Sequence, residues 1–141
     1  MLFQHTWKHV VSGQKTQTRR LVQEGDYATI DEDSPARPIT KVIRTADAGV
    51  PKVLFEVGKI YSVQPGIAKK TVGNIRLTAI RCERLHDLSD ADALKESPVT
   101  PDGDMADAQT ASKIFREIWN SMYAMPGDRW EDNPEVWVLE F

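Results

Sequence analysis

Apolar and polar positions follow two different periods along this chain, and the changes of period mark its expected elements. The clearest helical pattern runs from Ala111 to Met122, where apolar residues recur every three or four positions. A shorter helical pattern covers residues 3–11. Ser89 has the features of a helix cap, which predicts a further helix ending near Glu96. The pattern therefore predicts about three helices.

Alternating or continuous apolar runs predict short strands between these helices. The predicted strands are residues 39–44, 52–57, 60–63, 75–82 and 136–141. The alternation shifts its parity near Ala79, which predicts a bulge or bend where a sheet curls. Residues 136–141 are apolar on both faces, as is typical of a central strand. The chain has no repeated strand–helix–strand unit, so the pattern favours an α+β fold with a small curled sheet or barrel.

Two stretches rich in proline, glycine and aspartate interrupt these elements. Residues 24–38 and 97–107 show no sustained period and are expected to be surface loops, the first of them long and mobile. Residues 46–51 are turn-rich and are expected to close a hairpin. A length of 141 residues is typical of one domain, so residues 1–141 are interpreted as a single domain with two loop insertions.

The net charge of −3 hides an uneven distribution along the sequence. Residues 1–86 hold 14 Lys/Arg and 8 Asp/Glu, whereas residues 87–141 hold 4 and 13. A basic N-terminal part predicts a phosphate-facing surface, which makes RNA or a nucleotide the expected partner. The alternative is that the two parts neutralise each other across the fold.

Cysteine, histidine and hydropathy patterns limit the class of protein. Cys82 is the single cysteine, and no stretch approaches the roughly 20 apolar residues of a membrane span. We therefore expect a soluble, cytoplasmic protein without a membrane partner. His5 and His9 are the only histidines at a helical spacing, so neither a metal site nor a cofactor is predicted. These patterns do not specify an oligomeric state.

Residues 13–20, Gly-Gln-Lys-Thr-Gln-Thr-Arg-Arg, concentrate the candidate chemistry. A glycine break, three cations and two hydroxyls in eight residues predict an anion-binding loop, although the sequence does not match a Walker loop. In an extended conformation Thr18 shares a face with Arg20 and not with Arg19. The alternative is a solvated basic turn. The candidate ligand- or RNA-binding residues are Lys15, Thr16, Arg19 and Arg20.

A lysine close to other cations also suggests catalysis. Its pKa falls when it is desolvated, and the neutral amine can then activate a nearby threonine. Such a pair needs a carboxylate to hold the amine or to carry the proton. The indoles of Trp119, Trp130 and Trp137 are interpreted as packing residues rather than as surfaces for base stacking.

Residues 13–20 resemble the Gly-x-Lys-x-x-Thr/Glu-x-Arg signature of ASCH domains, which belong to the PUA-like superfamily. Residues 85–96 are similar to the strand and helix of that family, which end in a glutamate. Residues 115–121 and 130–141 resemble the C-terminal helix and closing strand of ASCH-like proteins common in phages and prophages. The resemblance covers both ends and the middle of the chain, and the segment 24–55 is longer than in compact relatives.

The resemblance implies a small PUA-like β-barrel with a cleft for RNA or a nucleotide. Some ASCH proteins are amidohydrolases that deacylate N-acetylated cytidine with a lysine, a threonine and a glutamate, and others are described as ribonucleases. By motif position the resemblance assigns these catalytic roles to Lys15, Thr18 and Glu96, with Arg20 as the signature arginine. It therefore predicts that Lys15 and Glu96 meet. An interaction module of phage type without a small-molecule site is a third hypothesis.

Overall fold

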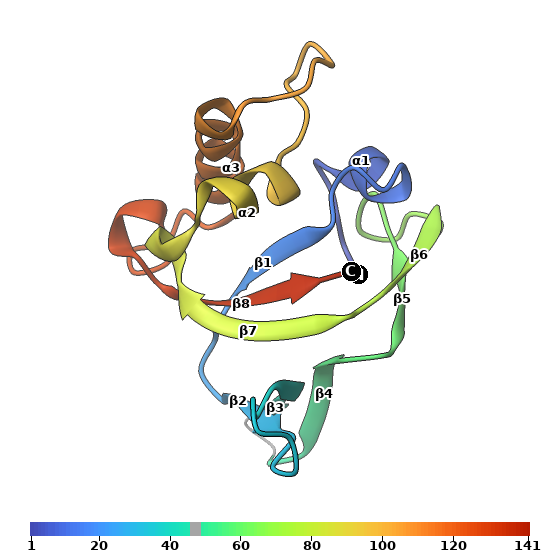
Figure 1. The fold of residues 1–141 in the computed structure, drawn as a ribbon, viewed down its shortest axis with the longest axis vertical. Coiled ribbons are helices and arrows are strands. Elements are labelled where there is room, and N and C mark those ends of the chain that lie inside the picture. Colours follow the sequence, from blue (N-terminus) through green and yellow to red (C-terminus); the bar gives the residue numbers. More distant parts are fainter. Residues whose placement is uncertain (46–48) are drawn as a thin grey trace.

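The structure is a computed structural model that describes residues 1–45 and 49–141. It has the expected α+β architecture, with antiparallel sheets and helices on one side (Figure 1). In chain order the helices and strands are α1 (Trp7–Val11), β1 (Gln17–Leu21), β2 (Asp26–Ile30), β3 (Ile39–Thr45), β4 (Pro51–Glu56), β5 (Ile60–Val63), β6 (Gly73–Arg76), β7 (Ala79–Arg84), α2 (Asp90–Glu96), α3 (Ala108–Met122) and β8 (Glu135–Glu140). Short 3₁₀ turns lie at Leu85–Asp87 and Trp130–Asp132.

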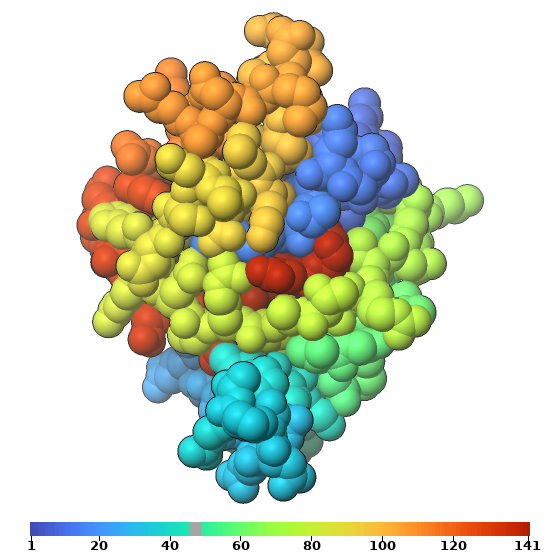
Figure 2. All heavy atoms as spheres, in the orientation of Figure 1, coloured from blue at the N-terminus to red at the C-terminus, as the bar shows by residue number. Residues whose placement is uncertain are grey.

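The last strand lies at the centre of the main sheet, as its two apolar faces predict. The strand order is β1-β8-β7, and both neighbours of β8 run antiparallel to it. The space-filling view shows β8 in red between the blue and yellow-green side chains of β1 and β7 (Figure 2). Val136 to Leu139 are all buried because both faces of the sheet are covered.

Two hydrophobic clusters cover the two faces of this sheet. Helices α2 and α3 lie on one face, and the sheet β2-β3-β4 lies on the other (Figure 1). The helix-side cluster consists of Leu21, Leu85, Phe115, Trp119, Val136 and Val138. The opposite cluster consists of Val42, Leu77, Ile80, Trp137 and Leu139. Trp119 and Trp137 are therefore core residues, as expected, whereas Trp130 is half-buried against the helix-side cluster.

A third cluster closes the end of the molecule at which α1 and the β5-β6 hairpin meet. It contains Phe3, Val10, Val63 and Ile75, and it brings the two chain ends together. The rings of Phe3 and Phe141 pack edge to face with centroids 5.7 Å apart. The backbone N–H of Phe3 donates to the carbonyl of Gln64 at 2.9 Å. This bond holds the first residues in an extended conformation, so α1 is shorter than the predicted helix of residues 3–11.

Of the two expected forms, a curled sheet or a barrel, the described residues do not form a barrel. Within residues 1–45 and 49–141 the strands form three separate sheets of three, three and two strands, and these sheets are not joined to one another. The parity shift near Ala79 is the boundary between β6 and β7, which belong to different sheets. It is therefore not a bulge within one strand, because the chain leaves one sheet at Arg76 and enters the next at Ala79.

The prediction that residues 24–38 form one long loop is also wrong. Strand β2 lies inside this range and pairs with β3, so that the segment contributes to a sheet. Gly25 permits this because it has a φ of +83°, and a Cβ there would lie 2.5 Å from the Thr45 carbonyl oxygen. The predicted strands at 39–44 and 52–57 are confirmed as β3 and β4. Of the predicted hairpin connection 46–51, residues 46–48 lie outside the described residues.

Helix α2 begins at the predicted cap, and α3 begins at Ala108, three residues before the predicted pattern. The Ser89 side chain accepts a hydrogen bond from the Asp92 backbone N–H at 3.2 Å, and Asp107 caps α3 in the same way through Thr110 at 2.8 Å. The expected loop of residues 97–107 joins α2 to α3 and projects from the body of the molecule (Figure 2). Across residues 1–45 and 49–141, no helix has the length and apolar character to cross a membrane.

Candidate functional site

The loop between α1 and β1 carries Lys15 to the end of α2. Gly13 follows the last turn of α1 with a φ of +77°, the left-handed conformation expected there. The backbone N–H of Lys15 donates to the His9 carbonyl at 2.9 Å. The backbone N–H of Thr16 donates to the Lys95 carbonyl at 3.2 Å. These two bonds place Lys15 directly beside Glu96.

Lys15 and Glu96 form a buried ion pair, which confirms the prediction that they meet. The Lys15 Nζ lies 2.8 Å from the Glu96 Oε2 and 2.7 Å from the Glu96 backbone carbonyl oxygen. Only 5% of the Lys15 side chain and 1% of the Glu96 side chain are exposed. Two residues separated by 81 positions in the sequence thus share one desolvated contact.

The environment of Lys15 lowers the pKa of its amine below the ordinary value of 10.5. Burial is the largest cause, because it penalises the charged form of the amine. The charge and hydrogen bond of Glu96 oppose the shift, and the nearby cations Arg20 and Arg19 add to it. The net effect brings the amine closer to the neutral form that a general base needs.

Arg19 makes the second contact to Glu96. Its Nη1 donates to the Glu96 Oε1 at 3.0 Å and to the Gln17 Oε1 at 2.6 Å. Its Nη2 donates to the Asp92 Oδ2 at 3.1 Å and also to the Glu83 carboxylate. The side chain of Arg19 is fully buried by these partners.

The expected alternation along β1 is present, but it places Arg19 rather than Arg20 beside Lys15 and Glu96. Lys15, Gln17 and Arg19 alternate onto the face that α2 covers, so that Arg19 is the arginine bound to Glu96. Arg20 points away from this network. It donates from Nη2 to the Leu2 carbonyl at 2.6 Å and packs on the Phe3 ring, with the guanidinium carbon 5.3 Å from the ring centroid.

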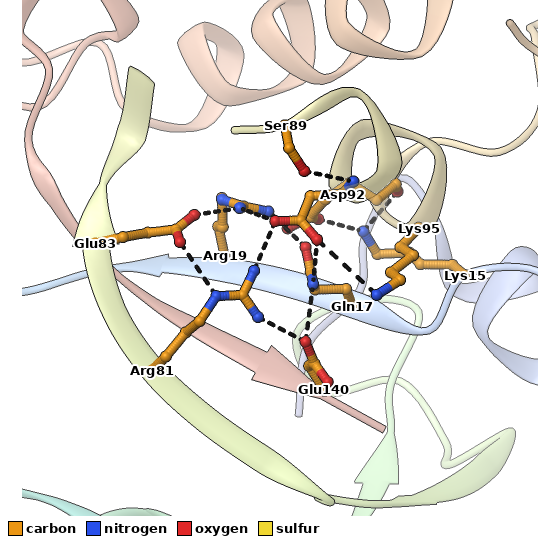
Figure 3. A network of polar contacts seen from close by, with 10 residues as sticks. Lys15, Gln17, Arg19, Arg81, Glu83, Ser89, Asp92, Lys95 and Glu140 are labelled. Atoms are coloured by element: carbon orange, nitrogen blue, oxygen red, sulfur yellow. Dashed lines mark hydrogen bonds and ion pairs between the residues drawn. The ribbon is translucent and has the colours of Figure 1, made fainter. Parts of the chain in front are cut away.

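The ion pairs continue outward from Arg19 to the surface of the main sheet (Figure 3). Arg81 of β7 donates to Asp92 at 2.6 Å, to Glu83 at 3.1 Å and to Glu140 at 2.6 Å. Burial opposes ionisation of Asp92, but hydrogen bonds from Gln17 and Arg19 and the charge of Arg81 outweigh it and lower its pKa. Cationic and acidic side chains therefore alternate from Lys15 to the surface, and each charge is paired with an opposite one. The buried Lys15–Glu96 pair is the inner end of this network.

A pocket lies against this pair. Its wall is formed by residues 2–6, by β1, by the end of α2 and by α3. The polar residues that line it beside the N-terminal segment are Lys15, Thr18, Arg19, Arg20, Glu96 and Ser97. The cavity volume is about 40 Å³, and an adjoining cavity of about 260 Å³ shares His5, Thr6, Ser97 and Ile118 with it. The two cavities therefore adjoin each other, and the smaller one, at Lys15, is called the inner pocket.

The predicted site residues thus fall into two groups. Lys15, Thr18, Arg19, Arg20 and Glu96 all line the inner pocket. Thr16 does not line it, and its backbone instead joins β1 to α2. No group of three or more histidine, cysteine or acidic side chains in the described part of the chain is arranged to hold a metal ion.

Sequence reasoning missed Gln17, Arg81, Glu83 and Asp92 as parts of this site. Glu83 and Arg81 alternate on β7, and Asp92 lies one helical turn before Glu96. The i, i+4 spacing of Asp92 and Glu96 was a usable signal, because it places both carboxylates on one helix face.

Comparison of this chain with protein-family models, with curated proteins and with solved structures finds no match.

Proposed function

We propose that this protein is an amidohydrolase that removes a small acyl group from an acylated nucleoside of the N-acetylcytidine type. The observation that carries the proposal is the buried Lys15–Glu96 pair in the wall of a narrow pocket that Thr18 also lines. A desolvated lysine with a lowered pKa and a hydroxyl that line the same pocket supply a base and a nucleophile for acyl transfer. The resemblance of residues 13–20 to ASCH domains supports the nucleoside substrate.

The reaction follows from these roles. The neutral Lys15 amine takes the Thr18 hydroxyl proton as the threonine oxygen attacks the acyl carbonyl carbon. The Lys15 ammonium then gives this proton to the departing amine of the base as the C–N bond breaks. Water next attacks the acyl-threonine ester, Lys15 again takes and returns the proton, and the free acid leaves. Glu96 holds the amine in place and stabilises each ammonium form.

The pairing of the basic residues favours this function over phosphate binding at the same position. Lys15 and Arg19 were expected to face RNA, but both are almost fully buried and bound to carboxylates. A phosphate in this pocket would have to compete with Glu96, Asp92 and Glu83 for its cations. A neutral acyl group meets no such competition.

RNA or nucleotide binding is the second candidate function. The observation that favours it is Arg20, whose guanidinium is half-buried in the same pocket wall and is bound by a carbonyl rather than by a carboxylate. We expect Arg20→Ala to weaken binding of a single-stranded RNA at low ionic strength. Unchanged binding in a salt titration of this variant would remove Arg20 from that role.

Acetate release from N-acetylcytidine tests the proposed enzyme. Thr18→Val, Lys15→Met and Glu96→Gln are each expected to lower the rate at least about 100-fold, because each removes a proton-transfer or nucleophilic group. Lys95→Met is the matched control, since the Lys95 side chain is half-exposed and its nearest carboxylate oxygen is 4.0 Å away. A wild-type protein without activity, or equal rates in all variants, would refute the proposal.

A further inference from the structure

A second pocket lies on the other side of Arg20, between the end of β1 and the hairpin β3-β4. Its volume is about 310 Å³. We call it the basic pocket and define it by its polar and aromatic lining residues, Arg20, Gln23, Arg44, Lys52, Phe55 and Tyr123. Arg20 lines both this pocket and the pocket at Lys15, so the two are neighbours.

The charge of the basic pocket is one-sided. Three cations line it, and no carboxylate is present among its lining residues within the described parts of the chain. Asp26 lies behind Arg44 with its side chain fully buried, whereas 32% of the Arg44 side chain is exposed. Asp26 neutralises Arg44 from behind, so Arg20 and Lys52 supply the net positive charge that the lining presents to a ligand.

Arg44 is held in a fixed orientation before any ligand arrives. Its Nε and Nη2 donate to the two carboxylate oxygens of Asp26 at 2.5 and 3.0 Å. Asp26 is itself fixed by the Gln23 backbone N–H at 3.1 Å and by the Trp137 Nε1 at 3.2 Å. A guanidinium fixed in this way loses little conformational entropy when it binds an anion.

Aromatic rings line the remainder of the pocket. Phe55 packs against the cluster between the main sheet and the sheet β2-β3-β4. Tyr123 packs on Trp119 with ring centroids 4.3 Å apart. Both side chains are half-buried and so are supported from behind. Fixed cations beside supported aromatic faces suit a ligand that carries both a phosphate and a flat apolar part.

We propose that the basic pocket binds a phosphate group of a nucleotide, either free or within an RNA strand. That this phosphate belongs to the molecule whose base enters the pocket at Lys15 rests on the proposed function. The proposal assigns a role to strands β3 and β4, which supply Arg44, Lys52 and Phe55. The amidohydrolase would then prefer a phosphorylated or polymeric acylcytidine to the free nucleoside.

Calorimetric binding of cytidine monophosphate and of cytidine provides the test, because it needs no turnover. The wild type is expected to bind the monophosphate about tenfold or more tightly than the nucleoside. Lys52→Gln is expected to weaken monophosphate binding about three- to tenfold and to leave nucleoside binding unchanged. Lys52 is exposed, so this variant should fold normally. Arg44→Gln should lose more affinity for the monophosphate than Lys52→Gln does. Lys70→Gln is the control, because it makes the same change of charge at another exposed position.

Equal affinity of the wild type for the monophosphate and the nucleoside would overturn the proposal. Equal affinities of Lys52→Gln and Lys70→Gln for the monophosphate would also overturn it. A short single-stranded RNA distinguishes the two sources of phosphate. If Lys52→Gln reduces the slope of log affinity against log salt by about one for RNA, the strand is the ligand. If Lys52→Gln loses affinity for the monophosphate but not for RNA, the free nucleotide is the ligand. If the wild type releases no acetate but still binds the monophosphate more tightly than the nucleoside, only the proposed amidohydrolase function is refuted.

Discussion

At the scale of single residues, the alternation of β1 places the side chains of the neighbours Arg19 and Arg20 on opposite faces of the strand. Arg19 is buried among Glu96, Asp92 and Glu83, whereas Arg20 binds the Leu2 carbonyl on the opposite face. The alternation itself was predictable from the sequence. Which face would meet the carboxylates was not, because that depends on where α2 packs.

Replacing each of these two arginines by leucine should separate their roles. Arg19→Leu is expected to lower the free energy of unfolding by about 3–5 kcal/mol, because it removes the fully buried cation that Glu96, Asp92 and Glu83 share and leaves Glu96 with Lys15 alone. Arg20→Leu removes one hydrogen bond to a carbonyl and is expected to cost about 1–2 kcal/mol. Urea denaturation measures both values. Similar losses in the two variants would contradict the assigned network.

The meeting of Lys15 with Glu96 was predicted from the resemblance to a family and is confirmed by the geometry. Composition alone indicated only that a carboxylate was needed. The partner could not be chosen by local physics, because 81 positions separate the two residues. The catalytic roles of the pair stay predictions.

At the scale of elements, helix α2 controls the site although it is only seven residues long. It presents Asp92 and Glu96 to β1, and its start depends on the Ser89 cap. A helix of this length is not stable alone, so its position depends on the cap and on the ion pairs.

Ser89→Ala is therefore expected to destabilise the protein by about 1 kcal/mol, because the Asp92 backbone N–H loses its acceptor. Thermal denaturation followed by circular dichroism measures the change. Ser121→Ala is the control, since Ser121 is exposed near the end of α3 and bonds only within its own helix. An equally small effect of both substitutions would show that the cap is dispensable.

Strand β2 shows the limit of element prediction. Its surroundings are rich in acidic residues, glycine and proline, which indicate a loop locally. The strand forms because its edge pairs with β3 and because Arg44 binds Asp26. By contrast, the capped helices and the central strand β8 carried strong local signals and were predicted correctly.

At the scale of the whole molecule, sheets and helices are joined by carboxylates that must stay ionised. Burial opposes ionisation of Asp26, but hydrogen bonds from Arg44, Gln23 and Trp137 outweigh it and lower its pKa below the ordinary value of 3.8. The pKa of Asp92 is also lowered. The unfolded chain therefore binds more protons than the folded protein in acid.

The stability that these two groups contribute is expected to be fully present well above pH 3.8 and to fall as the pH drops through their folded pKa values. Asp26→Asn should be less stable than the wild type at neutral pH and should lose less on acidification. Urea midpoints at neutral pH and in acid provide the measurement. A variant that shows the full acid dependence of the wild type would exclude Asp26 as a contributor.

The arrangement of the sheets is also a property of the whole molecule. The shift of apolar parity near Ala79 was visible in the sequence, but it did not reveal that β6 and β7 belong to different sheets. That distinction follows from long-range pairing, because β7 pairs with the last strand of the chain and β6 pairs with β5. Local periodicity carries no information on such partners.

The proposed role of Lys15 as the base is tested most directly by an NMR titration of its side chain combined with the pH dependence of acetate release. We expect Lys15 to titrate below the ordinary lysine value of 10.5, because burial disfavours its charged form. The base must be neutral to act, so kcat/KM should rise with pH through that same pKa and then level off. A Lys15 that titrates at or above 10.5, or a kcat/KM that does not follow its titration, would exclude Lys15 as the base.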